Sequence, residues 1–158
     1  MKVCLKNVNN VITSEQIEVI KEFVNFIQSQ LPLKNDVKIN LLRDRNVKMT
    51  TGVRYPKGNL FILFGNRLLI DVLRTLSHEW VHEFQHQKMG LKDNEKIQNI
   101  GGPEENMCNI LSGIFIKKFD KEFQSTLATP QTNTCFVENQ FNFNPWTNTW
   151  MNIMNIEI

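Results

Sequence analysis

The sequence predicts an α+β fold in which a small twisted sheet, of three strands or more, packs against three helices. Apolar residues recur at helical spacing over three long segments, near residues 13–31, 68–89 and 103–123. Between the first two segments, residues 37–41 alternate between apolar and polar, and residues 60–64 are apolar throughout, as expected for strands. A chain of 158 residues accommodates these elements in one domain.

The first helix begins at Thr13 or Ser14, because either hydroxyl can cap its N-terminus, and it ends before Pro32. The strand at 37–41 and a weaker one at 47–51 are expected to pair as a hairpin over residues 37–51, followed by a loop over residues 52–58. The strand at 60–64 is apolar on both faces, which predicts a central position in the sheet. The buried stripe of the first helix consists of Ile17, Ile20, Phe23, Val24 and Ile27.

The helix at 68–89 ends at Gly90, and Pro103 occupies a first helical position of the next helix. Each helix is expected to bury one face. For the helix at 68–89 this face is Leu69, Val72, Leu73, Leu76, Trp80 and Phe84, with the His/Glu side of the helix facing outward. For the helix at 103–123 it is Met107, Ile110, Leu111, Ile114, Phe115 and Phe119.

The composition changes near residue 125, so the predicted domain spans residues 1–124 and residues 125–158 form a C-terminal segment. This segment has no lysine or arginine but is rich in Asn, Thr and isolated aromatic residues. Such a composition fits either an irregular segment wrapped on the domain and anchored by its rings, or an arm that contacts a protein partner.

Charge and hydropathy exclude several classes of partner. A formal net charge of +2 is too small to predict nucleic-acid binding, and no apolar run approaches the roughly 20 residues that cross a membrane. The N-terminus lacks the apolar core of a signal peptide, and Cys4, Cys108 and Cys135 form no CxxC pair. We therefore expect a cytoplasmic chain with reduced thiols. Abundant Asn, Ile and Lys is typical of AT-rich genomes such as those of bacteriophages, which would place the chain in a host cytoplasm or a virion.

The chemistry is concentrated in the helix at 68–89, where His78-Glu79-x-x-His82 forms an HExxH pattern. Residues four apart lie one above the other on a helix, so both imidazoles can reach one Zn²⁺ ion. Glu79, beside His78, can act as a general base without binding the metal. His86 lies about 12 Å along the axis from His78, too far for all three histidines to bind one ion.

A catalytic zinc site needs a third protein ligand, and Glu104 and Glu105 on the next helix are the candidates. Acidic residues in a first helical turn are also favoured by the helix dipole alone, so these residues do not by themselves establish a ligand. They are adjacent and about 100° apart around the helix, so only one can point at the metal.

At this point the chain resembles the gluzincin metallopeptidases, in which HExxH is joined to a glutamate on a following helix, often with Asp or Asn four residues later. Glu105-Asn106-Met107-Cys108-Asn109 matches this pattern, with Cys where the family usually has a small residue. The resemblance implies Glu105 as the third ligand, and Asn109 as the hydrogen-bonding partner of a zinc-binding histidine. The order of elements is similar to that of compact ImmA-like and SprT-like peptidases, and the run HEWVHEFQ resembles HExxHxxQ stretches in phage proteins of the SprT type. Those take a later histidine as ligand, and none follows His86.

The resemblance implies a zincin-like fold and zinc-dependent hydrolysis of a peptide or protein substrate, with His78, His82 and Glu105 on the Zn²⁺ and Glu79 as general base. In zincins the substrate pairs with a sheet edge, for which the hairpin at 37–51 is the candidate here. Tyr55 and His86 are candidates for a donor that stabilises the oxyanion. The alternative is a non-enzymatic zincin-fold component of a viral particle or protein complex, with a structural or vestigial zinc site.

Overall fold

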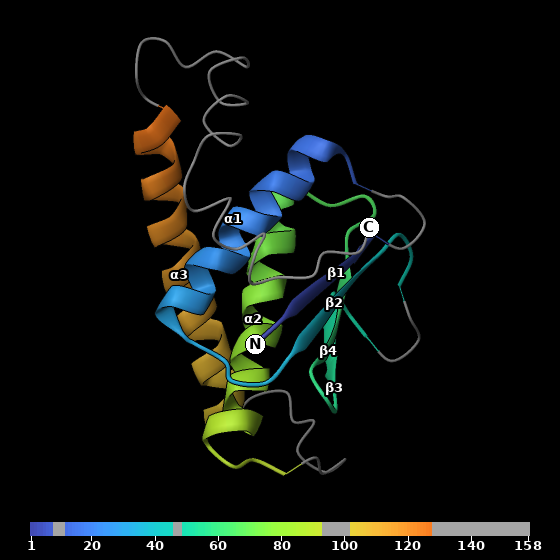
Figure 1. Ribbon diagram of the computed structural model, residues 1–158, viewed down its shortest axis with the longest axis vertical. Helices are drawn as coiled ribbons and strands as arrows, with labels where there is room; N and C mark the ends of the chain where they lie inside the picture. Colours follow the sequence, from blue (N-terminus) through green and yellow to red (C-terminus); the bar gives the residue numbers. More distant parts are fainter. Residues whose placement is uncertain (8–11, 46–48, 93–101, 128–158) are drawn as a thin grey trace.

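The fold is α+β, as predicted, with a four-stranded mixed sheet and three helices (Figure 1). The computed structural model describes residues 1–7, 12–45, 49–92 and 102–127, with side chains as far as Phe123. Cys135 and the C-terminal segment beyond residue 127 lie outside the described residues. No helix within the described ranges combines the length and the apolar character needed to cross a membrane.

The strands lie in the order β1-β2-β4-β3, where β1 is Val3–Asn7, β2 is Val37–Leu42, β3 is Gly52–Tyr55 and β4 is Asn59–Leu63. The pairs β1–β2 and β2–β4 are parallel, whereas β3 is antiparallel to β4 and forms one edge of the sheet. Leu60 and Ile62 of β4 are completely buried, which is consistent with the interior position predicted for this strand.

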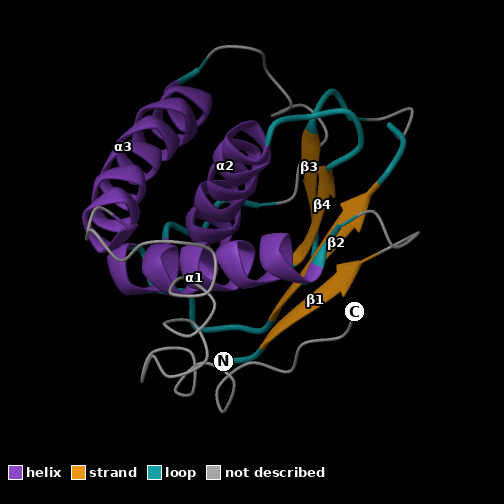
Figure 2. Cartoon of the chain, turned by 90° about the horizontal axis from the view of Figure 1, so that it is seen from above, coloured by secondary structure: helices purple, strands orange, loops and turns teal. Residues whose placement is uncertain are grey.

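The three helices, α1 (Ser14–Gln30), α2 (Leu69–Lys88) and α3 (Pro103–Leu127), lie on the same side of the sheet (Figure 2). The predicted cap of α1 is confirmed, because the Thr13 hydroxyl accepts from the Gln16 amide while the Gln16 side chain accepts from the Thr13 amide. Gly90 follows α2 with a φ of +70°, a conformation that favours glycine after a helix end.

Three predictions about the sheet are wrong, and strand β1 was not predicted. The hairpin over residues 37–51 does not form, because β2 pairs with β1 and β4 and not with β3. The segment predicted as a loop, residues 52–58, contains β3. Residues 49–51, the described part of the predicted second strand, form no strand, and β3 begins at Gly52. The apolar β4 takes the interior position and leaves the less apolar β3 at the edge.

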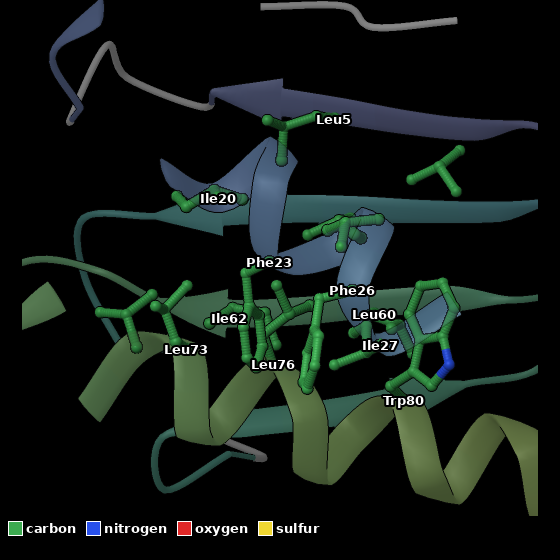
Figure 3. Packing of buried hydrophobic residues seen from close by; sticks show 14 of the residues in the cluster. Leu5, Ile20, Phe23, Phe26, Ile27, Leu60, Ile62, Leu73, Leu76 and Trp80 are labelled. Atoms are coloured by element: carbon green, nitrogen blue, oxygen red, sulfur yellow. The ribbon is translucent and has the colours of Figure 1, made fainter. Parts of the chain in front are cut away.

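The core lies between the sheet and the helices (Figure 3). Every residue of the stripe predicted for α1 is buried, and the Trp80 indole on α2, also fully buried, donates to the Leu31 carbonyl over 2.9 Å. Rings of α1 and α3 contact one another, as between Phe23 and Phe119, whose centroids are 5.0 Å apart. These contacts fix α2 between the sheet and α3.

The buried face of α3 differs from the predicted one. Ile110 is 62% exposed and Ile114 is 41% exposed, although both were expected to face the core. The helix is rotated so that its buried side is formed by Cys108, Ser112, Phe115, Ile116 and Phe119. This rotation decides which residues of α3 reach the histidines of α2.

Candidate metal centre

Other elements pack against helix α2 on two sides, and the side chains of HExxH lie between α2 and these elements. The apolar side of α2 packs on the sheet and α1 as predicted, but the His/Glu side, expected to face outward, lies against β3 and α3. Thr75, Glu79 and Gln85 are therefore buried, whereas His78 and His82 remain partly exposed. The histidines lie where the cover from β3 and α3 is incomplete.

Three side chains from two helices converge at this position. The Nε2 atoms of His78 and His82 are 3.2 Å apart. The Glu105 carboxylate of α3 faces both, with Oε1 2.9 Å from the His78 Nε2 and Oε2 3.2 Å from the His82 Nε2. Two imidazoles and a carboxylate thus point their donor atoms at one location.

These distances fit a tetrahedral ion. For Zn²⁺ with ligands at 2.0–2.1 Å, neighbouring ligand atoms in a tetrahedron are about 3.3 Å apart. The Nε2–Nε2 separation of 3.2 Å is close to this value, as is the separation of each nitrogen from its nearer Glu105 oxygen, 2.9 Å to Oε1 for His78 and 3.2 Å to Oε2 for His82. Two nitrogens and one carboxylate oxygen form a donor set typical of catalytic zinc.

Gln85, which is fully buried, orients His82. Its Nε2 donates to the Glu104 carbonyl over 2.9 Å, so its Oε1 must be the atom that lies 3.2 Å from the His82 Nδ1. An amide oxygen only accepts, so the His82 Nδ1 carries the hydrogen and its Nε2 presents a lone pair. Gln85 thereby links the first turn of α3 to the ring orientation that a metal requires.

Cys108 is buried beside the same ring. Its Sγ lies 3.3 Å from the His82 Nδ1 and 3.7 Å from the Gln85 Oε1. His78, His82 and Cys108 form a group that could hold a metal ion. The thiol, however, contacts the ring nitrogen opposite the one that faces His78 and Glu105. Burial raises the pKa of Cys108, as do the carboxylates of Glu105 and Glu79, so the neutral thiol is favoured.

The two other polar residues predicted for this part of α3 do not reach the histidines with their side chains. Asn109 is exposed and makes no hydrogen bond to His78 or His82, so the predicted partner role is wrong and Gln85 and Cys108 lie there instead. Glu104 contributes its backbone carbonyl, which accepts from Gln85, while the neighbouring Glu105 carboxylate faces the histidines.

Glu79 lies next to this centre, beneath the edge strand. A Cβ atom added to Gly52 of β3 would lie 2.6 Å from the Thr75 Cγ2 and 3.0 Å from the Glu79 Oε1, so only glycine allows this close approach. Glu79 is 6% exposed. Burial, together with the Glu105 carboxylate, raises the pKa of Glu79 to about 8, whereas Arg54 acts in the opposite direction.

Arg54 and Glu83 form a second contact between β3 and α2, two strand residues after Gly52 and one helical turn after Glu79. The Arg54 Nε donates to the Glu83 Oε2 over 2.6 Å, and both side chains are almost completely buried. Gln87 donates to the other carboxylate oxygen of Glu83 over 2.9 Å. This ion pair holds the edge strand against α2 beside Glu79.

The predicted oxyanion candidates lie elsewhere. The ring of Tyr55 packs edge-to-face against Phe61, with centroids 5.4 Å apart, and His86 lines a polar cleft near the end of α2. The roles of Gln85, Cys108 and Arg54 were not predicted. Gln85 had a sequence signal, because it follows HExxH at the spacing of the HExxHxxQ stretches, whereas Arg54 had none.

Comparison of the chain with protein-family models, with curated proteins and with solved structures finds no match. Any functional inference therefore depends on the geometry of the site itself.

Proposed function

We propose that the chain is a zinc-dependent peptidase of the gluzincin type, with His78, His82 and Glu105 as the metal ligands. The observation that supports this proposal is the convergence of two Nε2 atoms and a carboxylate at tetrahedral spacing, beside a buried glutamate and under an open sheet edge. Glu105 is preferred to Cys108 as third ligand because it faces both Nε2 atoms, whereas the thiol faces the His82 Nδ1.

Zinc, when bound, would polarise the scissile carbonyl and activate a water molecule for attack. Glu79 is the general base: it accepts a proton from the attacking water and delivers it to the leaving amine. Burial and the Glu105 carboxylate raise the pKa of Glu79. A divalent cation held by His78, His82 and Glu105 would act in the opposite direction and favour the ionised carboxylate that a general base requires. In this proposal Glu79, which packs against Gly52, is the base and not a ligand.

The substrate would bind as an extended peptide along the outer edge of β3, which replaces the incorrectly predicted hairpin at 37–51. The Leu63 amide donates to the Thr51 carbonyl, so the hydrogen-bonded pairs of the β3–β4 ladder fall on residues 51, 53 and 55. The backbone groups of Gly52 and Arg54 consequently point away from β4. A peptide that pairs with Gly52 would pass directly over Glu79.

The test is zinc content followed by digestion of an unbiased peptide library. We expect about one zinc ion per chain, lost after His78→Ala, and hydrolysis that disappears in Glu79→Gln while the zinc remains. Glu79→Gln purified in parallel also controls for contaminating proteases. Protein without zinc at neutral pH, or equal hydrolysis by wild type and Glu79→Gln, would refute the proposal.

A second candidate is a non-enzymatic component with a structural zinc site, and the position of Cys108 favours it. If the thiol rotated onto the metal, His78, His82, Glu105 and Cys108 would form a closed four-ligand site without room for a substrate. Cobalt substitution distinguishes the two, because a Co²⁺–thiolate bond gives an intense near-ultraviolet absorption band that Cys108→Ser abolishes. We expect no such band if the site is catalytic.

A further inference from the structure

A polar cleft of about 620 Å³ lies at the C-terminal end of α2. Three segments far apart in sequence form its walls: the loop before β2, the end of β3 with its following turn, and the last turns of α2. The charged and titratable residues that line it are Lys34, Asp36, Arg54, Lys57, Glu83 and His86.

The cleft continues the proposed substrate path. Arg54 lies two residues after Gly52 on the same face of β3, and Glu83 lies one turn after Glu79 on α2. Two strand residues, or one helical turn, correspond to about 5–7 Å. A peptide that runs along β3 from the metal centre would therefore enter the cleft two to four residues from its scissile bond.

Hydrogen bonds between the segments hold the cleft in shape without a ligand. The Gln87 Oε1 accepts from the backbone amides of Lys34 and Asn35, at 2.9 and 3.0 Å, and its Nε2 donates to Glu83. Glu83 in turn pairs with Arg54 of β3. A single glutamine thus joins the loop before β2, the helix α2 and the ion pair that reaches the edge strand.

The lining keeps a net positive charge after this pairing. Arg54 and Glu83 neutralise each other, which leaves the ammonium groups of Lys34 and Lys57 against one carboxylate, that of Asp36, whose Oδ1 accepts from the backbone amide of Lys2. Lys34 and Lys57 are exposed, and they line the cleft from two different walls, the loop before β2 and the turn after β3. An anion in the cleft would be attracted to both ammonium groups.

We infer that this cleft is a specificity subsite that binds a carboxylate of the peptide substrate, two to four residues from the bond that is cleaved. The inference rests on the proposed peptidase function and adds a preference for acidic peptides to it. An acidic side chain or a free C-terminal carboxylate supplies the same chemistry. Lys34 and Lys57 are the residues that would recognise it.

The test compares peptides that are identical except for Glu or Gln at one position at a time, all with amidated C-termini. Cleavage by the zinc-loaded protein should favour Glu about 5-fold in kcat/KM at two to four residues on one side of the bond, and 0.5 M salt should weaken this preference. Lys34→Glu combined with Lys57→Glu should abolish it. The matched control, Lys117→Glu combined with Lys118→Glu on the exposed surface of α3, should not. A second set of peptides carries a free C-terminal carboxylate two to four residues from the bond in place of Glu. Comparing the two sets shows whether the cleft prefers an acidic side chain or a C-terminal carboxylate.

Binding of the same fluorescein-labelled peptides to Glu79→Gln, followed by fluorescence anisotropy, keeps the inference testable without hydrolysis. If no peptide is cleaved but Glu peptides bind Glu79→Gln more tightly than Gln peptides, and the Lys34/Lys57 change removes the difference, the peptidase proposal fails and the anion-binding cleft stands. Equal cleavage and binding of Glu and Gln peptides would overturn the inference. An equal effect of the α3 control would also overturn it, because it would reflect net charge and not the cleft.

Discussion

The clearest test of how the fold organises the centre is Gln85→Leu. This change keeps an apolar side chain of similar size in a fully buried position but removes the hydrogen bonds to the Glu104 carbonyl and the His82 Nδ1. At about 1 kcal/mol for each buried hydrogen bond, the metal-free protein should lose about 2 kcal/mol of unfolding free energy. His82 would also be free to rotate or to place its hydrogen on Nε2. Zinc affinity should therefore fall about 10–100-fold, or about 1.4–2.8 kcal/mol.

Two further variants separate these effects. Gln85→Glu keeps an acceptor for the His82 Nδ1–H but cannot donate to the Glu104 carbonyl, so it should lose stability while it retains most of the zinc affinity. Asn109→Ala, at an exposed position away from the histidines, should change neither quantity. Zinc affinity is measured by competition with a chromophoric chelator, and stability by urea unfolding with the metal removed. Wild-type zinc affinity in folded Gln85→Leu, or a large loss in Asn109→Ala, would refute this reasoning.

Three other predictions follow from the geometry. Glu105→Gln should weaken zinc binding more than any Gln85 variant does, whereas Glu104→Gln should leave the chelator-measured affinity unchanged; the opposite result would move the ligand by one residue. Gly52→Ala should cost about 1–3 kcal/mol in urea unfolding and reduce hydrolysis, because its Cβ meets Thr75 and Glu79, whereas Gly113→Ala, which meets nothing within 4 Å, should not destabilise the protein. In the metal-free protein the pKa of Glu79 rises from an ordinary value of 4.5 to about 8, so its contribution to stability is full below pH 4.5 and is lost as the pH rises towards 8. Glu79→Gln should accordingly gain stability relative to wild type between pH 5 and 8, by at most about 1.4 kcal/mol per pH unit, and a pH-independent difference would contradict the burial of an ionisable carboxyl.

The parts of the fold that were predictable are those encoded by local periodicity. The buried stripe of α1 and most of the core face of α2 repeat every three or four residues, and both were identified from that spacing. Strand pairing is not local. Residues 37–42 pair with residues 3–7 and 59–63, and neither partner is the next apolar segment along the chain. Only Val3 and Leu5 of β1 are buried, so its alternation repeats once, whereas Val37, Ile39 and Leu41 show two repeats.

The same distinction holds within the site. His78, Glu79 and His82 share one helix, so their relative placement followed from helical geometry. The residues around them depend on how α3 is rotated against α2. Cys108 lies about 60° from Glu105 around the helix and Asn109 about 40° in the other direction, and the sequence alone does not determine which of them meets His82. The packing of Phe115 and Phe119 on α1 fixes this rotation and brings Cys108 to the ring.

The site brings together two pairs of groups that repel each other when they are charged, so other contacts must stabilise its geometry. Burial and the like charge of Glu105 raise the pKa of Glu79, and burial and the neighbouring His78, whose Nε2 lies 3.2 Å from that of His82, lower the pKa of His82. Neither of these two pairs stabilises the fold. The geometry is held by the packing of α2 against the sheet, by the Gln85 link to α3, by the Arg54–Glu83 pair and by the contacts of the Glu105 carboxylate with the two imidazoles. A cation at the Nε2 atoms would be attracted to both carboxylates and would use the lone pairs of both rings. Binding of a divalent metal ion at the proposed site should therefore stabilise the protein.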